Sequence, residues 1–334
     1  MEGYRWERID RGIKARTDDI YCVLSLKEML YLAGPRVTLI LALLVLSLVL
    51  PMYWQKVIIA AAIMGLLAVS WDLLAHYVGL ISLGQALFFG IGGYTSGVMN
   101  FYFELPILLA VPIATIGAAV VCVVLLLPTL RLRGIYFALT SLVLPLITAR
   151  VIEAIGLFGG TEGLTGLSPL PNIWVEMFVL LLMFLITVFG FRRFVETDFG
   201  LVLGAIRDNE QAVRSAAINV NWCKTLALFL AALPGTFSGV WMSHIYMSVG
   251  LGAFALDYSI MPIAAAIIGG TGTLAGPAIG AFILVPLSEI LRELGVLRIV
   301  FYALIIVAFV VLKPEGLFTY LRRKYHQFER KVAI

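Results

Sequence analysis

Charged side chains are scarce in this sequence. Of its 334 residues only 13% are charged, while 61% are hydrophobic. Soluble domains average roughly 25% charged and 45–50% apolar residues. The charges are also unevenly placed, and they leave several apolar runs that match the roughly 20 residues a helix needs to cross a bilayer. The composition therefore predicts a multi-span membrane protein and excludes a soluble globular enzyme.

The residues and motifs that build catalytic, metal or nucleotide sites are also missing. Cys22, Cys122 and Cys223 lie far apart without CxxC spacing, which excludes a disulfide framework and a zinc site. The three histidines form no HExxH motif, and neither GxSxG nor GxxxxGK[ST] occurs. The net charge of +4 is too low for a nucleic-acid surface. No cleavable signal peptide is expected, because a long charged leader precedes the first apolar run.

Ten apolar segments predict an all-α, polytopic membrane protein with about ten transmembrane helices. The first segment ends in Tyr53 and Trp54, which is typical of the aromatic belt at a membrane interface. The third and eighth are short and rich in glycine, which predicts interrupted helices. The segments are 37–54, 57–77, 86–101, 106–127, 135–154, 174–191, 224–247, 257–270, 276–291 and 297–312.

Lysine and arginine indicate the orientation, because cytoplasmic loops carry an excess of both. With the N-terminus inside, the predicted inner segments hold 20 of the 24 basic residues. Ten helices place both termini in the cytoplasm, and eight would do the same. The inner segments are 1–36, 131–133, 192–224 and 313–334.

The same pattern divides the chain into a charged cytoplasmic leader (1–36), a transmembrane region (37–312) and a basic cytoplasmic tail (313–334). Within the leader, two acidic residues precede an apolar stretch that Gly-Pro closes, which predicts a capped helix over 20–32. This helix would lie along the inner membrane surface or extend the first span.

Two glycine-rich segments, 79–97 and 269–280, contain glycines spaced four residues apart, which lets helix backbones approach closely. These glycines are Gly93 and Gly97 in the first segment and Gly272, Gly276 and Gly280 in the second. In the predicted topology each cluster lies early in one of two oppositely oriented halves. The pair thus indicates an inverted repeat around a central pathway. Tight helix packing alone is the alternative.

Residues 196–224 are too many for a minimal loop between spans and predict a cytoplasmic pair of short helices. Thr197 or Asp198 can cap a first helix, and Asp208 or Asn209 can cap a second over 210–218. The expected apolar face of the second helix comprises Ala212, Val213 and Ala216, and the wetter side carries Arg207, Glu210 and Arg214. Such a pair indicates docking to a soluble partner. An amphipathic connector on lipid headgroups is the alternative.

Ionisable residues inside predicted spans are candidate functional groups. Asp72 and His76 lie four residues apart and hence on one helix face. They form either a proton relay or a satisfied polar pair. Arg150 and Glu153 lie near an outer helix end, where mutual neutralisation is a sufficient explanation.

Six stretches, in order and with family-like spacing, resemble the M-type permease subunit of ABC importers for branched-chain amino acids. They cover most of residues 55–318. The stretches are GLISLGQALFFGIGGYTS (79–96), LRLRGIYFALTSL (130–142), GGTEGLTGL (159–167), FGLVLGAIRDNEQA (199–212), IGGTGTLAGPAIGA (268–281) and KPEGLF (313–318).

The resemblance implies a non-enzymatic permease subunit that works by alternating access in a bacterial or archaeal cytoplasmic membrane. Its partners would be a second homologous permease, two ABC ATPase subunits that bind ATP and Mg²⁺, and a periplasmic substrate-binding protein. The chain itself would bind no cofactor.

Two sets of residues are the candidate functional sites. The stretch that matches the family's cytoplasmic coupling motif comprises Arg207, Asp208, Asn209, Glu210, Ala212 and Arg214. The pathway candidates, which offer hydrogen bonds without charge, are Gln85, Tyr94, Thr95 and Ser96.

Three positions depart from the family pattern. Gln85 stands where histidine is usual, Asp72 where asparagine is usual, and Ala217 where glycine commonly ends the coupling motif. A permease for urea, short amides or another small polar solute is therefore an alternative. A proton-coupled secondary transporter that uses Asp72 and His76 is a rival from another class. An intramembrane enzyme would need a catalytic pair that the sequence does not offer.

Overall fold

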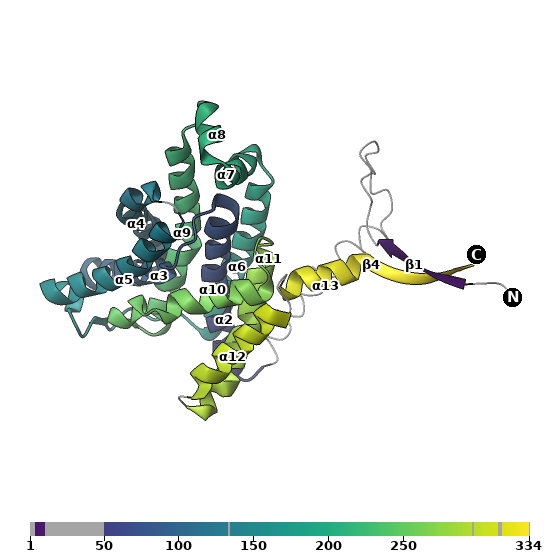
Figure 1. Ribbon diagram of the computed structural model, residues 1–334. Coiled ribbons are helices and arrows are strands. Elements are labelled where there is room, and N and C mark those ends of the chain that lie inside the picture. The colour runs from purple at the N-terminus through teal and green to yellow at the C-terminus, as the bar shows by residue number, and fades with distance from the viewer. Residues whose placement is uncertain (1–3, 11–49, 133, 296, 313–315, 334) are drawn as a thin grey trace.

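The computed structural model of this protein is a bundle of long apolar helices with a short helical pair at one end (Figure 1). The structure describes residues 4–10, 50–132, 134–295, 297–312 and 316–333. The expected helix over 20–32 and most of the predicted span 37–54 lie outside these residues. The expectation of a mainly helical, polytopic membrane protein is confirmed.

Sequence signals at the helix ends explain where several of the long helices begin and end. Pro51 and Pro106 directly precede α2 and α4, where a missing backbone N–H removes no intrahelical bond. The Asn172 side chain caps α6 by accepting the N–H of Trp174 and of Val175.

The long helices are α2 (Met52–Asp72), α3 (Gln85–Phe103), α4 (Ile107–Leu126), α5 (Ile135–Ile155), α6 (Ile173–Val195), α9 (Val220–Ile245), α10 (Asp257–Gly269), α11 (Ala275–Ile290) and α12 (Leu297–Leu312). Short turns join them as η1 (Leu73–Val78), η2 (Leu127–Arg131), η3 (Leu157–Gly159), η4 (Leu251–Phe254) and η5 (Leu291–Leu294).

The expected number of ten spans is wrong for the part of the chain that the structure describes, where six helical segments are long and apolar enough to cross a membrane. Helix α3 has enough residues, but its four glycines and polar side chains lower its hydropathy. Helices α11 and α12 have 16 residues each, about 24 Å at 1.5 Å per residue, against a hydrocarbon core of about 30 Å. The six candidate spans are Met52–Val78, Ile107–Arg131, Ile135–Ile155, Ile173–Val195, Val220–Ile245 and Leu251–Gly269.

Helix α2 lies at the centre of the bundle, where it packs against α6, α9, α10 and α11 (Figure 1). In its candidate span 89% of the most apolar window is buried, compared with 28% in α5 and in α6. The outer helices instead expose large apolar side chains such as Leu108, Val124 and Leu182. An apolar outer surface of this extent is typical of a protein surrounded by lipid or by other membrane subunits.

Helices α3 and α9 cross with their backbones in close contact. A Cβ atom at Gly92 would overlap the carbonyl oxygen of Thr236, and one at Gly239 would overlap that of Phe89. Added Cβ atoms at Gly93 and Gly97 would lie 3.0 and 2.8 Å from the Val249 side chain, and the one at Gly93 would also lie 3.4 Å from the carbonyl oxygen of Gly239 in α9. The tightest backbone contact therefore involves glycines outside the expected four-residue spacing.

Each glycine-rich segment contains a break between two helices. Residues 79–84 separate η1 from α3, and residues 270–274 separate α10 from α11. Side chains of other helices bind the backbone at the first break: the Ser141 hydroxyl accepts the N–H of Leu83, and the Ser259 hydroxyl accepts the N–H of Ala86, each at 3.0 Å. The hairpin around the second break is close-packed, because Cβ atoms at Gly276 and Gly280 would overlap the carbonyl oxygens of Gly270 and Ala265.

Two small antiparallel sheets accompany the helices, and the fold class remains all-α. Strand β1 (Tyr4–Asp10) pairs with β4 (Gln327–Ala333), which follows α13 (Leu317–His326) in the basic tail. Aromatic and β-branched residues in both strands favour this conformation. Strand β2 (Leu164–Thr165) pairs with β3 (Ser248–Val249) and joins the loop before α6 to the loop after α9.

The α3–α9 crossing generates a stability prediction. Replacing Gly239 by alanine must push the two backbones apart, which costs about 1–3 kcal/mol for an overpacked interior. We expect Gly239→Ala to lower the unfolding temperature of the detergent-extracted protein, measured by tryptophan fluorescence. Gly190→Ala is the matched control, because Gly190 lies in α6 with open space around its Cα. An equal unfolding temperature for both variants would contradict the close contact.

Candidate functional site

The segment expected to couple the chain to a soluble partner forms two short helices that project from one end of the bundle, between α6 and α9 (Figure 1). Helix α7 (Asp198–Asp208) is followed by α8 (Glu210–Ser215). The Asn209 side chain caps α8 by accepting the N–H groups of Gln211 and Ala212, each at 3.1 Å. Helix α8 is thus shorter than the expected 210–218.

The end of α8 carries a backbone conformation that alanine rarely adopts. Ala217 has φ +60°, in the left-handed region, and its N–H donates to the carbonyl of Arg214 at 3.1 Å. The residue that adopts this conformation after a helix is usually glycine, because steric crowding of a Cβ atom there costs about 1–2 kcal/mol.

Glu210 does not lie on the solvent-exposed face of α8, where the sequence pattern predicted it. Its carboxylate contacts Arg214 at 2.6 Å and Lys224 of α9 at 3.1 Å. The side chains of Glu210 and Lys224 are only 13% and 6% exposed. The expected apolar face is also divided, because Val213 is buried while Ala212 and Ala216 are exposed. The reason for both differences is that α8 packs against α7 and α9, with Glu210 bound to Lys224 and Val213 in the hydrophobic core.

Arg207, at the end of α7, binds the central helix. Its Nη1 donates to the backbone carbonyl of His76 in η1 at 2.8 Å, and its Nε donates to the Asp208 carboxylate at 2.9 Å. The aliphatic part of Arg207 lies over Gly79, where an added Cβ would be 3.0 Å from Cγ. Helix α7 is therefore attached to the turn that continues α2.

Asp72 and His76 are not hydrogen-bonded to each other in the structure. The Asp72 carboxylate is fully buried and accepts two backbone N–H groups, from Gly272 at 2.7 Å and from Leu274 at 3.1 Å. His76 lies in the π-helical turn η1 and is exposed. The geometry favours the satisfied polar group over the proton relay, with backbone N–H groups as the partners of Asp72 rather than His76.

The pathway candidates all lie on α3, but they do not share one face. Gln85, the first residue of α3, is buried; its Oε1 lies 3.4 Å from the Ser70 hydroxyl, and its Nε2 has no partner among the described residues. The buried Tyr94 hydroxyl also has no partner there, and the Tyr94 ring stacks on Phe254. Thr95 is half-buried. The structure thus separates two unpaired polar groups, on Gln85 and Tyr94, from the rest of the set.

The fourth candidate, Ser96, belongs to a buried polar network that sequence analysis did not find. The Ser168 carbonyl can only accept, so His244 donates from Nδ1 to it at 3.0 Å, and Nε2 accepts from the Ser96 hydroxyl at 2.8 Å. The Asn100 side chain binds the N–H and hydroxyl of Ser168 at 2.8 and 3.1 Å. This network attaches the 164–170 loop to α3 and α9. A lone histidine late in an apolar segment was its only sequence signal.

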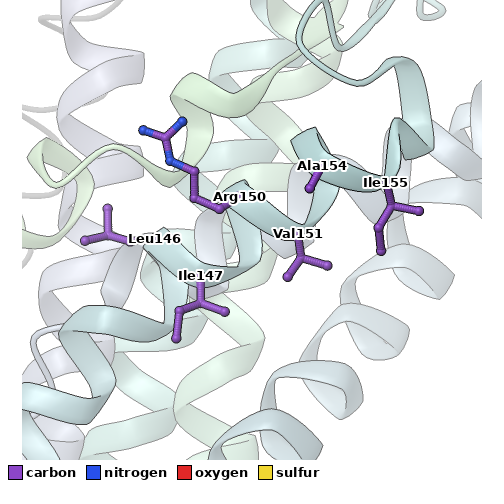
Figure 2. A pocket seen from close by; sticks show the side chains of 6 residues that line it. All are labelled: Leu146, Ile147, Arg150, Val151, Ala154 and Ile155. Atoms are coloured by element: carbon purple, nitrogen blue, oxygen red, sulfur yellow. The ribbon is translucent and has the colours of Figure 1, made fainter.

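A shallow apolar hollow follows the outer face of α5 (Figure 2). Arg150 is its only charged lining residue, and the guanidinium contacts Glu153 at 2.6 Å. None of the pathway candidates lines this hollow. Within the described ranges no three His, Cys, Asp or Glu side chains are grouped so that they could hold a metal ion.

Comparison with known proteins identifies the family. Residues 53–311 match the family described as "branched-chain amino acid transport system / permease component". The chain is 24% identical over 284 residues to the high-affinity branched-chain amino acid transport system permease protein LivM of Escherichia coli (strain K12), covering 75% of this chain and 67% of that protein. LivM of Salmonella typhimurium is 23% identical over the same length and coverage.

A third relative comes from Methanocaldococcus jannaschii. The probable branched-chain amino acid transport permease protein LivM of Methanocaldococcus jannaschii is 26% identical over 235 residues, covering 62% of this chain and 68% of that protein. No solved structure matches. Since the family match covers well over half of the chain and agrees with the motifs in the sequence, the chain belongs to the branched-chain amino acid transport permease family.

Proposed function

We propose that this chain is one of two permease subunits of an ATP-driven importer that moves branched-chain amino acids into the cell. As a permease component of an ABC transporter, the chain is a transport subunit and not an enzyme. The observation that carries the proposal is the helical pair α7–α8, which projects from the bundle while Glu210–Lys224 and Arg207–His76 attach it to α9 and η1. A firmly attached projecting pair can transmit a partner's movement to the membrane helices.

The proposed partners are a second homologous permease, two ABC ATPase subunits and a periplasmic substrate-binding protein. ATP and Mg²⁺ would be bound by the ATPase subunits. We place the α7–α8 end and both termini in the cytoplasm, because most basic residues lie in segments that this orientation puts inside. The chain's apolar outer surface, on α4 and α5 among others, offers contact area for the second permease or for lipid.

Gln85 and Tyr94 are the proposed polar groups of the translocation pathway. Each places inside the bundle a polar atom that no described residue binds, where a passing solute with hydrogen-bonding groups would satisfy it. Ser96 has a different role in this proposal, because His244 already binds its hydroxyl. Thr95 stays in the set as a half-buried neighbour.

The identity of the transported solute is the most specific part of the proposal. The names of the relatives support branched-chain amino acids, while identities of 23–26% leave urea, short amides or another small polar solute as the alternative. The proton-coupled transporter is disfavoured, because backbone N–H groups already bind both carboxylate oxygens of Asp72.

Co-purification tests the proposed assembly. We expect gentle detergent extraction of the tagged protein from its native cells to recover Walker-motif ATPases and a second permease, identified by mass spectrometry. If the chain emerges alone under conditions that preserve other membrane complexes, the importer proposal is wrong.

A charge exchange tests the attachment of α8 to α9. Glu210→Lys places a third positive charge beside Arg214 and Lys224 in a nearly buried site, where breaking an ion pair costs about 3 kcal/mol. We expect loss of ATPase association and of uptake, with recovery when Lys224→Glu is added. Glu196→Lys is the control, because the Glu196 side chain at the same end of the bundle is 52% exposed. Full uptake by the single Glu210→Lys variant would contradict the coupling role.

Uptake kinetics test the pathway assignment. Gln85→Met keeps a long unbranched side chain but removes the amide, whose Nε2 has no partner among the described residues, so we expect the uptake rate per complex to fall with unchanged ATPase association. Leu87→Met, a volume-conserving change in the buried part of the same helix, controls for packing. If both variants transport like the unaltered protein, Gln85 is not part of the pathway.

A further inference from the structure

Two sets of side-chain bonds meet at the π-helical turn η1, which continues the buried helix α2. On one side, Arg207 of α7 donates to the carbonyl of His76 at 2.8 Å and covers Gly79 with its aliphatic part. Gly79 has φ +79° and ends the turn, so a side chain there would be strained and would also displace Arg207. Movement of α7 therefore acts directly on η1.

On the other side, η1 and the last residue of α2 hold the 270–274 loop between α10 and α11. Gly272 is bound at both of its backbone groups: its N–H donates to Asp72 at 2.7 Å, and its carbonyl accepts from the Tyr77 hydroxyl at 2.7 Å. A Cβ atom at Gly272 would overlap the His76 ring, so this ring lies directly on the loop backbone. The second Asp72 oxygen accepts the N–H of Leu274 at 3.1 Å.

The loop held in this way determines how α11 starts. Leu274, directly before α11, has φ +56°, a positive value that is unfavourable for a leucine. Its side chain is only 1% exposed, so packing and the Asp72 bond together maintain the conformation. The Thr273 hydroxyl also accepts the N–H of Gly276 at 2.9 Å. A strained residue that neighbouring elements hold in place is typical of a segment with a second accessible arrangement.

We propose that η1 is a mechanical relay: displacement of α7 moves η1 through Arg207, and η1 moves the 270–274 loop, and with it α10 and α11, through Asp72 and Tyr77. Asp72 and Tyr77 are positioning residues in this relay and do not contact the solute. Single π-helical turns inside longer helices often occur at functional sites, because their hydrogen bonds rearrange more easily than those of an α-helix. The relay rests on the proposed function, since it requires α7–α8 to move with the nucleotide state of the ATPases.

The chemistry of Asp72 and Tyr77 gives two variants that loosen the loop with little change in volume. Asparagine at position 72 has one acceptor oxygen and an NH₂ group, so it can accept only one of the two N–H groups that Asp72 binds. Tyr77→Phe removes the hydroxyl that donates to the Gly272 carbonyl and keeps the ring. Tyr136→Phe is the matched control, because Tyr136 on α5 is 68% exposed.

Cysteine labelling measures the accessibility of α8 and of the 270–274 loop, the two ends of the relay, in the complete transporter in native membranes. The reporters are Thr271→Cys in the loop and Ser215→Cys in α8, since both positions are exposed. Cys122 and Cys223 are buried and stay in place, while Cys22 is replaced by serine. Maleimide labelling rates are measured without nucleotide and with ATP plus vanadate, and uptake and ATP hydrolysis are measured on the same membranes.

We expect nucleotide to change the labelling rate at both reporters. In Asp72→Asn and Tyr77→Phe, the nucleotide-free rate at Thr271→Cys should rise about threefold or more, as for a loop that opens locally. Its response to nucleotide should disappear, and uptake per ATP hydrolysed should fall about fivefold or more, within the range of measured couplings between sites. Tyr136→Phe should match the unaltered protein in all three measurements.

The two reporters separate failure of the relay from failure of the proposed function. A nucleotide response at Ser215→Cys without one at Thr271→Cys overturns the relay and leaves the importer proposal standing. No response at either reporter overturns both. If Asp72→Asn and Tyr77→Phe keep normal loop labelling and normal uptake per ATP, the two residues do not connect α7 to the loop and the relay is wrong.

Discussion

The hydrocarbon core of a membrane offers no water to bind backbone groups, and this constraint governs the two helix breaks of the bundle. Each N–H group freed at a break must find a partner inside the protein. The Asp72 carboxylate accepts the N–H groups of Gly272 and Leu274 at the second break, and the hydroxyls of Ser141 and Ser259 accept backbone N–H groups at the first. Polar residues in the apolar segments thus allow the chain to interrupt its helices inside the bundle.

The sequence pattern predicted the apolar segments, the family, and the helical pair that Asn209 caps, because all three depend on local order or on motifs. It overestimated the number of spans, since glycine-rich and short apolar segments form helices without the length or hydropathy to cross a bilayer alone. It also misplaced Glu210 and left Asp72 ambiguous. Their partners, Lys224 and the backbone of Gly272, are 14 and 200 residues away in the chain, beyond the reach of helical spacing.

The central position of α2 explains why a projecting segment can influence the membrane region. Helix α2 contacts α6, α9, α10 and α11, and its continuation η1 contacts α7. A partner that moves α7 therefore acts on the most buried helix of the bundle rather than on a peripheral one. The ion pair between Glu210 and Lys224 attaches α8 to α9, so the α7–α8 segment is joined to two different membrane helices.

The crossing of α3 and α9 has a consequence for the kind of movement that the bundle permits. With glycine at positions 92 and 239, no side chain separates the backbones at the contact. Helices that pack by interlocking side-chain ridges resist both separation and rotation. A bare backbone contact keeps the dispersion attraction that opposes separation, but it presents few ridges against rolling. The crossing therefore opposes separation at the glycines, while the Ser96–His244 hydrogen bond, further along the same two helices, opposes rolling.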